Sequence, residues 1–181
     1  MRSFLICACT AAALTVQPIL DASATATTQW VERPTHVFVD GTEVSNPEHF
    51  VTIDSWSGVK TSWVPVAAMQ QALRAANLHT TWNGTTLNFI PPFWPGWKRN
   101  PNITFGTELT TGKRMAFAIQ GLKLEYAPLK DANNPKNGEM TAYIPIYYAN
   151  EFIQKVFLIQ TKWNGRTWDM NPPAMANVKI K

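Results

Sequence analysis

The chain has almost no cysteine, and the little it has lies at the N-terminus. Cys7 and Cys9 both fall within the first 26 residues. If this segment is removed on export, the remaining chain contains no thiol. Such a chain forms no disulfide and offers no thiolate as a nucleophile or metal ligand. Its fold must then depend on a hydrophobic core alone.

Histidine and clustered charge are also scarce. The three histidines, at 36, 49 and 79, lack the i, i+2 or i, i+4 spacing that gathers imidazoles around one metal. Lys and Arg exceed Asp and Glu by 16 to 12, and no run of five basic residues occurs. This charge supports at most a weak attraction to an anionic wall polymer or membrane surface. We therefore predict no metal, no cofactor and no nucleic-acid partner.

The sequence has no apolar run long enough to span a membrane. The longest, residues 4–16, follows Arg2 and precedes small residues that end in Ala24-Thr25-Ala26. These features predict a signal peptide over residues 1–26 and a secreted or cell-wall-associated protein. A lipoprotein attached at Cys9 is an alternative, but its apolar segment would be very short. Export without cysteine is more typical of bacteria than of animal secreted proteins.

Catalytic motifs are missing as well. The chain contains neither a Gly-x-Ser-x-Gly elbow nor a phosphate-binding loop. A glycosidase would need two carboxylates at a controlled separation. No spacing pairs any two of the candidates, which are Asp54, Glu108, Glu125, Glu151 and Asp169.

What the chain does have is one pattern that occurs twice. The first copy contains Asp40-Gly41, Trp63-Val64-Pro65-Val66, Trp82-Asn83-Gly84 and Pro91-Pro92. The second copy contains Gln120-Gly121, Tyr143-Ile144-Pro145-Ile146, Trp163-Asn164-Gly165 and Pro172-Pro173. The first two motifs lie 80 residues apart and the last two lie 81 apart, so one inserted residue explains the difference.

Local patterns predict the elements of each copy. Asp40-Gly41 indicates a hairpin turn, and Asn83-Gly84 is the preferred pair for a type I′ turn. Apolar residues at helical spacing predict helices over residues 66–76 and 146–156. The polar segment 130–139 is rich in Asn, Pro and Gly, so we expect a solvated loop that replaces part of the first copy.

These elements predict an α+β protein made of two tandem repeats, each a small antiparallel sheet packed against one helix. The predicted repeats span residues 35–92 and 116–173, with a Trp- and Pro-rich linker over 93–115 and a C-terminal tail over 174–181. Each repeat is near the lower size limit for independent folding. We therefore expect the repeats to pack on each other, with the linker aromatics in the joint.

The order of motifs resembles the copper amine oxidase N-terminal-like domain, or stalk domain, in two tandem copies. The motifs that carry the resemblance are residues 37–41, 63–66 and 81–84 in the first copy, and 118–121, 143–146 and 162–165 in the second. The resemblance implies a small sheet packed on one helix, in exported proteins of Gram-positive bacteria. It does not imply amine oxidation, because the family name comes from an appendage outside the catalytic domain.

Tryptophan is the one residue in excess, with eight in the chain. Trp82 and Trp163 recur at one repeat position, which indicates packing over a sheet. The predicted binding residues are four that have no aromatic counterpart, namely Trp56, Trp94, Trp97 and Trp168. The alternative for Trp94 and Trp97 is that they seal the joint between the repeats.

These observations favour a non-catalytic exported module that binds or spaces at the cell surface. Its partner would be a cell-wall polysaccharide or another surface protein. One alternative is a small secreted hydrolase with its site at the repeat joint. Another is an inhibitor or assembly subunit that uses an exposed sheet edge.

Overall fold

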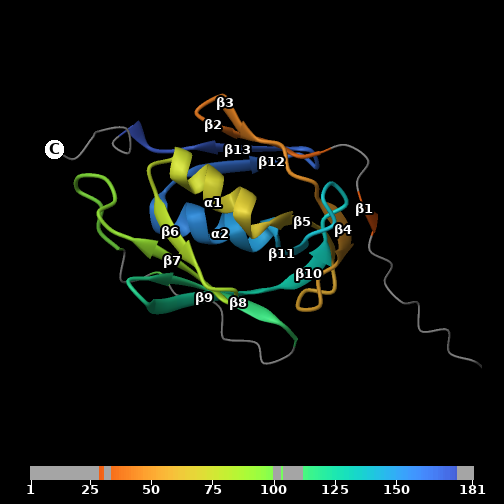
Figure 1. The fold of residues 1–181 in the computed structure, drawn as a ribbon. Coiled ribbons are helices and arrows are strands. Elements are labelled where there is room, and N and C mark those ends of the chain that lie inside the picture. Colours follow the sequence, from red (N-terminus) through yellow and green to blue (C-terminus); the bar gives the residue numbers. More distant parts are fainter. Residues whose placement is uncertain (1–28, 31–33, 100–102, 104–111, 175–181) are drawn as a thin grey trace, which may run out of the picture.

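The computed structural model describes residues 29–30, 34–99, 103 and 112–174. The predicted signal peptide, Glu108 and all but the first residue of the predicted tail lie outside these ranges. Within them the protein contains two helices and three sheets (Figure 1). The predicted α+β class is therefore confirmed.

The elements follow one order twice, after a short first strand β1 (Gln29–Trp30). The first half contains β2 (His36–Val39), β3 (Thr42–Ser45), β4 (Phe50–Ile53), β5 (Lys60–Pro65), α1 (Val66–Ala75), β6 (His79–Trp82) and β7 (Thr86–Ile90). The second half contains β8 (Arg114–Ile119), β9 (Leu122–Pro128), β10 (Lys130–Asn133), β11 (Met140–Pro145), α2 (Ile146–Phe157), β12 (Gln160–Trp163) and β13 (Thr167–Asn171).

The two halves share all three sheets, which differs from the expectation of one separate sheet per repeat. The strand orders are β1-β4-β5-β11-β10, β12-β13-β2-β3 and β6-β7-β8-β9. The last strand of each half pairs in parallel with the first strand of the other half, as β7 with β8 and β13 with β2. Each half thus completes a sheet of the other half.

The pairing of β5 with β11 relates the halves by an approximate two-fold axis. Val64 lies opposite Ile144, Trp63 opposite Pro145 and Pro65 opposite Tyr143. Exchanging each residue for the one 80 positions away reproduces the same three pairs. The ends of β5 and β11, which lead into α1 and α2, therefore lie side by side.

Both helices lie between the sheets in Figure 1, with β2, β3, β12 and β13 above them, and β8 and β9 below. The face predicted for the second helix is confirmed, since the five positions at helical spacing are all buried: Ile146, Ala149, Phe152, Ile153 and Val156. The first helix also buries its predicted face. Helices and sheets contribute to one core that spans both halves.

A second, smaller cluster consists of Phe50, Trp63 and Tyr143. All three belong to the five-stranded sheet, and the ring of Phe50 stacks on that of Trp63 with centroids 5.9 Å apart. The aromatic position that alternates between Trp63 and Tyr143 is fully buried in both halves. This position of the repeat therefore belongs to the core in both halves.

Two local predictions are wrong. Residues 130–139 do not form a loop throughout, because Lys130–Asn133 is strand β10 and pairs with β11. Long-range pairing with β11 outweighs the polar composition. The turn at Asn83-Gly84 is not type I′, since only Gly84 has a positive φ, of 92°. The Asn83 side chain instead accepts hydrogen bonds from the Thr85 and Thr86 amides. The hairpin at Asp40-Gly41 forms as predicted, with positive φ at both residues.

Candidate functional site

A groove opens where the β4–β5 turn meets the start of α2, and we call it the tyrosine groove. Its volume is about 330 Å³. The residues that line it are Asp54, Ser57, Val59, Lys60, Thr61, Pro145, Tyr147 and Tyr148. The first five come from the first half of the chain and the last three come from the second. Pairing of β5 with β11 brings the two sets together.

Asp54 organises the β4–β5 side of the groove. Its carboxylate is buried, with 2 % of the residue exposed. One carboxylate oxygen accepts a hydrogen bond from the Trp56 amide at 2.9 Å. The other accepts bonds from the Ser57 hydroxyl at 2.7 Å and the Tyr148 hydroxyl at 2.8 Å. Asp54 therefore fixes the turn and ties it to α2.

Tyr148 forms the rigid wall of the groove. Its ring meets that of Trp56 edge-on, with centroids 5.9 Å apart, and its hydroxyl is held by Asp54. Burial, together with the hydrogen bond to Asp54, raises the pKa of the Tyr148 hydroxyl. The phenol therefore stays protonated at neutral pH, and it donates to Asp54 instead of acting as a base.

Tyr147 and Lys60 form the exposed part of the groove. Tyr147 is 61 % exposed, and its ring meets that of Tyr148 edge-on at 5.4 Å. Lys60 is also exposed at the mouth of the groove. An exposed ring beside a fixed one gives a ligand an apolar surface, and Lys60 adds a mobile positive charge.

The two-fold relation places a second groove at the equivalent position of the other half, and we call it the alanine groove. Its volume is about 510 Å³. Ala67 and Ala68 stand where the tyrosine groove has Tyr147 and Tyr148. The charged residues on its lining are Glu48, Lys136 and Glu139. The alanine groove also extends over residues 44–48 and Gln71, whose counterparts do not line the tyrosine groove.

The structure separates the four predicted binding tryptophans. Trp168 is fully buried in the core, where its indole donates to the Asn150 side chain at 2.8 Å. Trp94 is 6 % exposed and meets the ring of Phe157 edge-on. Trp97 stacks on Phe157, and its indole donates to the Val156 carbonyl at 3.1 Å. These three rings therefore serve packing, and Trp94 and Trp97 lie against the end of α2.

Trp56 is the predicted residue that contacts the tyrosine groove, since it is partly exposed and supports Tyr148. Sequence reasoning missed Tyr147 and Tyr148 as site residues. The available signal was an aromatic pair two and three residues after the helix-start proline Pro145, at positions where the first half has two alanines.

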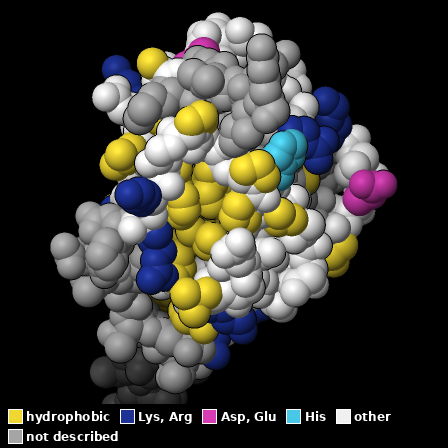
Figure 2. Space-filling view, turned by 90° about the vertical axis from the view of Figure 1, so that its left-hand side faces the viewer, with side chains coloured by type: hydrophobic (Ala, Val, Ile, Leu, Met, Phe, Trp, Pro, Cys, Tyr) yellow, Lys and Arg dark blue, Asp and Glu magenta, His cyan; other side chains and the backbone are white. Residues whose placement is uncertain are grey.

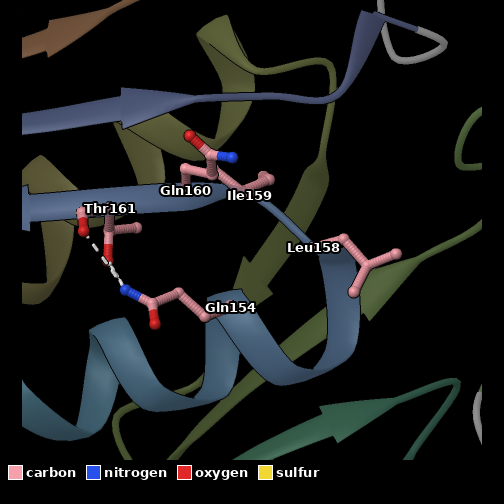
Figure 3. A pocket seen from close by; sticks show the side chains of 5 residues that line it. All are labelled: Gln154, Leu158, Ile159, Gln160 and Thr161. Atoms are coloured by element: carbon pink, nitrogen blue, oxygen red, sulfur yellow. Dashed lines mark hydrogen bonds between the residues drawn. The ribbon is translucent and has the colours of Figure 1, made fainter.

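Another hollow lies at the end of α2 and is seen in Figure 3. Its lining residues are Gln154, Leu158, Ile159, Gln160 and Thr161. Gln154 reaches across to β12 and donates to both the carbonyl and the hydroxyl oxygen of Thr161. No charged or aromatic side chain lines it, so it offers a ligand fewer anchors than the tyrosine groove does.

Figure 2 shows the side of the molecule on which the segment after β7 lies. Hydrophobic side chains gather on this face, and Lys and Arg side chains border them. A face of this kind is a candidate contact surface for a protein.

Two buried ionisable groups lie outside these grooves. Burial raises the pKa of Glu125 to about 7, the carboxylate of Glu151 adds to the rise, and Lys155 opposes it. Burial lowers the pKa of His49, and Arg166 lowers it further. The His49 ring is fixed by a 2.7 Å hydrogen bond between its Nδ1 and the Thr35 hydroxyl. Neither residue lines the tyrosine or alanine groove.

The arrangement does not assemble a metal centre in the part of the chain that the structure describes, where no three His, Cys, Asp or Glu side chains converge. In that same part, neither helix has the length and apolar character needed to cross a membrane. The single carboxylate in the tyrosine groove already accepts four hydrogen bonds. These bonds fix the orientation of the Asp54 carboxylate within the groove.

No family model, curated protein or solved structure matches the chain. The resemblance to the copper amine oxidase N-terminal-like domain therefore stays a prediction.

Proposed function

We propose that the protein is a non-catalytic exported binding module of the bacterial cell surface, and that its tyrosine groove binds a cell-wall polysaccharide. The observation that carries this proposal is the exposed Tyr147 ring beside the fixed Tyr148. A sugar ring has apolar C–H faces and polar hydroxyl edges. It is complementary to an exposed aromatic ring with polar groups around it.

Rigidity of the groove supports the same function. The Asp54–Tyr148 hydrogen bond and the Trp56 contact hold one wall before any ligand arrives. A preformed wall lowers the entropy that binding costs. Thr61 adds a hydroxyl group to the lining, where it can exchange hydrogen bonds with sugar hydroxyls.

The test compares retention of purified variants on isolated cell-wall polysaccharide. We expect Tyr147→Ala to weaken binding about tenfold, because exposed aromatic anchors carry about 1–2 kcal/mol in such contacts. Leu122→Ala is the matched control, since Leu122 is 58 % exposed and lies outside the groove. Equal retention of Tyr147→Ala and wild type would contradict the proposal.

A further inference from the structure

We propose that the tyrosine groove selects a negatively charged polysaccharide, and that Lys60 is the residue that interacts with its negative charges. This inference rests on the proposed function and adds the chemical class of the ligand. The relevant polymers carry phosphodiester or carboxylate groups along a sugar or polyol backbone.

The charges around the groove support this selectivity. Lys60 is exposed on the lining and makes no ion pair with any residue that the structure describes. The carboxylate of Asp54 is buried and accepts four hydrogen bonds from within the protein, so its charge is less accessible to a ligand than that of Lys60. Lys130 also lies close enough to Asp54 for the carboxylate to affect its pKa, which burial lowers. The accessible charge of the groove is therefore positive.

The alanine groove has the opposite character. Met140 stands at the position equivalent to Lys60, and Glu139 stands at the position equivalent to Val59. Glu48 and Glu139 outnumber Lys136 on its lining. An anionic polymer would be repelled by the alanine groove and attracted to the tyrosine groove. Of the two related grooves, the tyrosine groove is therefore the one that selects anionic polymers.

Position favours a role for Lys60 in specificity rather than in stability. It is the first residue of β5 and pairs with Ile53 at the turn end of the β4–β5 ladder. The flexible stem lets the ammonium follow charges spaced along a polymer. The aromatic rings then supply contact area, and Lys60 supplies the preference between neutral and anionic chains.

The experiment measures binding of three soluble polymers to the purified protein by calorimetry. Poly(glycerol phosphate) and a polyuronate are the anionic probes, and dextran is the neutral one. We expect Lys60→Gln to weaken binding of both anionic probes about three- to tenfold and to reduce its dependence on salt. Lys60→Arg retains the charge and should retain the affinity. Lys136→Gln, in the alanine groove, is the matched control and should have no effect.

The outcomes separate this inference from the proposed function. If Tyr147→Ala weakens binding of every polymer while Lys60→Gln changes none, charge selectivity is wrong and the groove still binds sugar. Tighter binding of dextran than of either anionic probe by the wild type would also overturn the inference. If Tyr147→Ala changes nothing, the proposed function itself fails. Loss of binding to phosphate alone, or to uronate alone, identifies which anion the groove takes.

Discussion

The two grooves share a backbone turn and differ in the side chains that surround it. In both turns a glycine amide donates to a backbone carbonyl, Gly58 to Asp54 at 2.8 Å and Gly138 to Asn134 at 2.7 Å. In both, the side-chain oxygen at the first position accepts an amide two residues later. Only Asp54 also binds a tyrosine of α2. The turn is thus scaffold, and the aromatic wall is an addition specific to one half.

The helices differ in the same way. Phe152 of α2 stacks on Phe117, with centroids 4.5 Å apart, whereas Ala72 occupies the equivalent position of α1. Both residues are fully buried. The small residue in one helix and the large one in the other fill a common core, because the halves share their sheets. A position where the two halves carry different side chains can therefore serve either packing or binding. The solvent exposure of the side chain distinguishes the two roles.

The largest expected effect tests this asymmetry of the core. Phe152→Ala should lower the free energy of unfolding by about 3–5 kcal/mol, because it removes a ring that contacts Phe89, Phe117 and Phe157. Ala72→Gly should cost about 1 kcal/mol, mainly through helix propensity. Urea denaturation followed by tryptophan fluorescence measures both. Similar losses for the two variants would show that the helices contribute equally.

An intermediate effect concerns Glu125, whose counterpart in the other half is Ser45. Burial raises the pKa of Glu125 from 4.5 to about 7, so the folded protein keeps a proton that the unfolded chain has released. Its contribution to stability is complete below pH 4.5 and is lost as the pH rises through about 7. We expect a loss of roughly 1–3 kcal/mol across this range.

Denaturation at a series of pH values checks this expectation for wild type and Glu125→Gln. The Gln variant should lack the decline, because an amide does not titrate. Ser45→Ala is the control in the other half and should keep the pH dependence of the wild type. An identical pH profile for Glu125→Gln and wild type would rule out Glu125 as the source.

The smallest effect concerns the ends of the helices. Asn77 after α1 and Leu158 after α2 both have left-handed backbones, with φ of 60° and 56°. Asparagine adopts this conformation at a lower free-energy cost than leucine does. Leu158→Asn should therefore raise stability by about 0.5–1 kcal/mol, and Asn77→Leu should lower it by about as much. Thermal melts of the two variants give the comparison, and a destabilised Leu158→Asn protein would contradict it.

Local features of the fold could be predicted from the sequence, and long-range ones could not. The helix faces follow from apolar spacing, and the Asp40-Gly41 hairpin follows from the conformational freedom of its residues. The polar residues of β10 predict a loop, because no local pattern indicates that this segment pairs with β11. The two halves share their sheets through contacts between residues far apart in the sequence. No short motif indicates such contacts.

The candidate site was predictable only in part for the same reason. Trp56 is an aromatic residue without an aromatic counterpart in the other half, but Trp94 and Trp168 share that property and lie in the core. Asp54 and Tyr148 are 94 residues apart and meet through β5 and β11. Exposure of Tyr147 is decided by which face of α2 the sheets leave open, and that face is set by the whole fold.

The parallel pairing of β13 with β2 has a consequence for how the chain reaches this structure. It joins residues 131 positions apart, such as His36 and Thr167, so the sheet closes only after β13 has been synthesised. Folding should therefore be slow and finish late, as expected for a protein of high contact order. A chain cut between the halves would leave β2 and β8 as open edges. Those edges would pair with β7 or β13 of another copy, and proteolysis would yield exchanged dimers in place of two free halves.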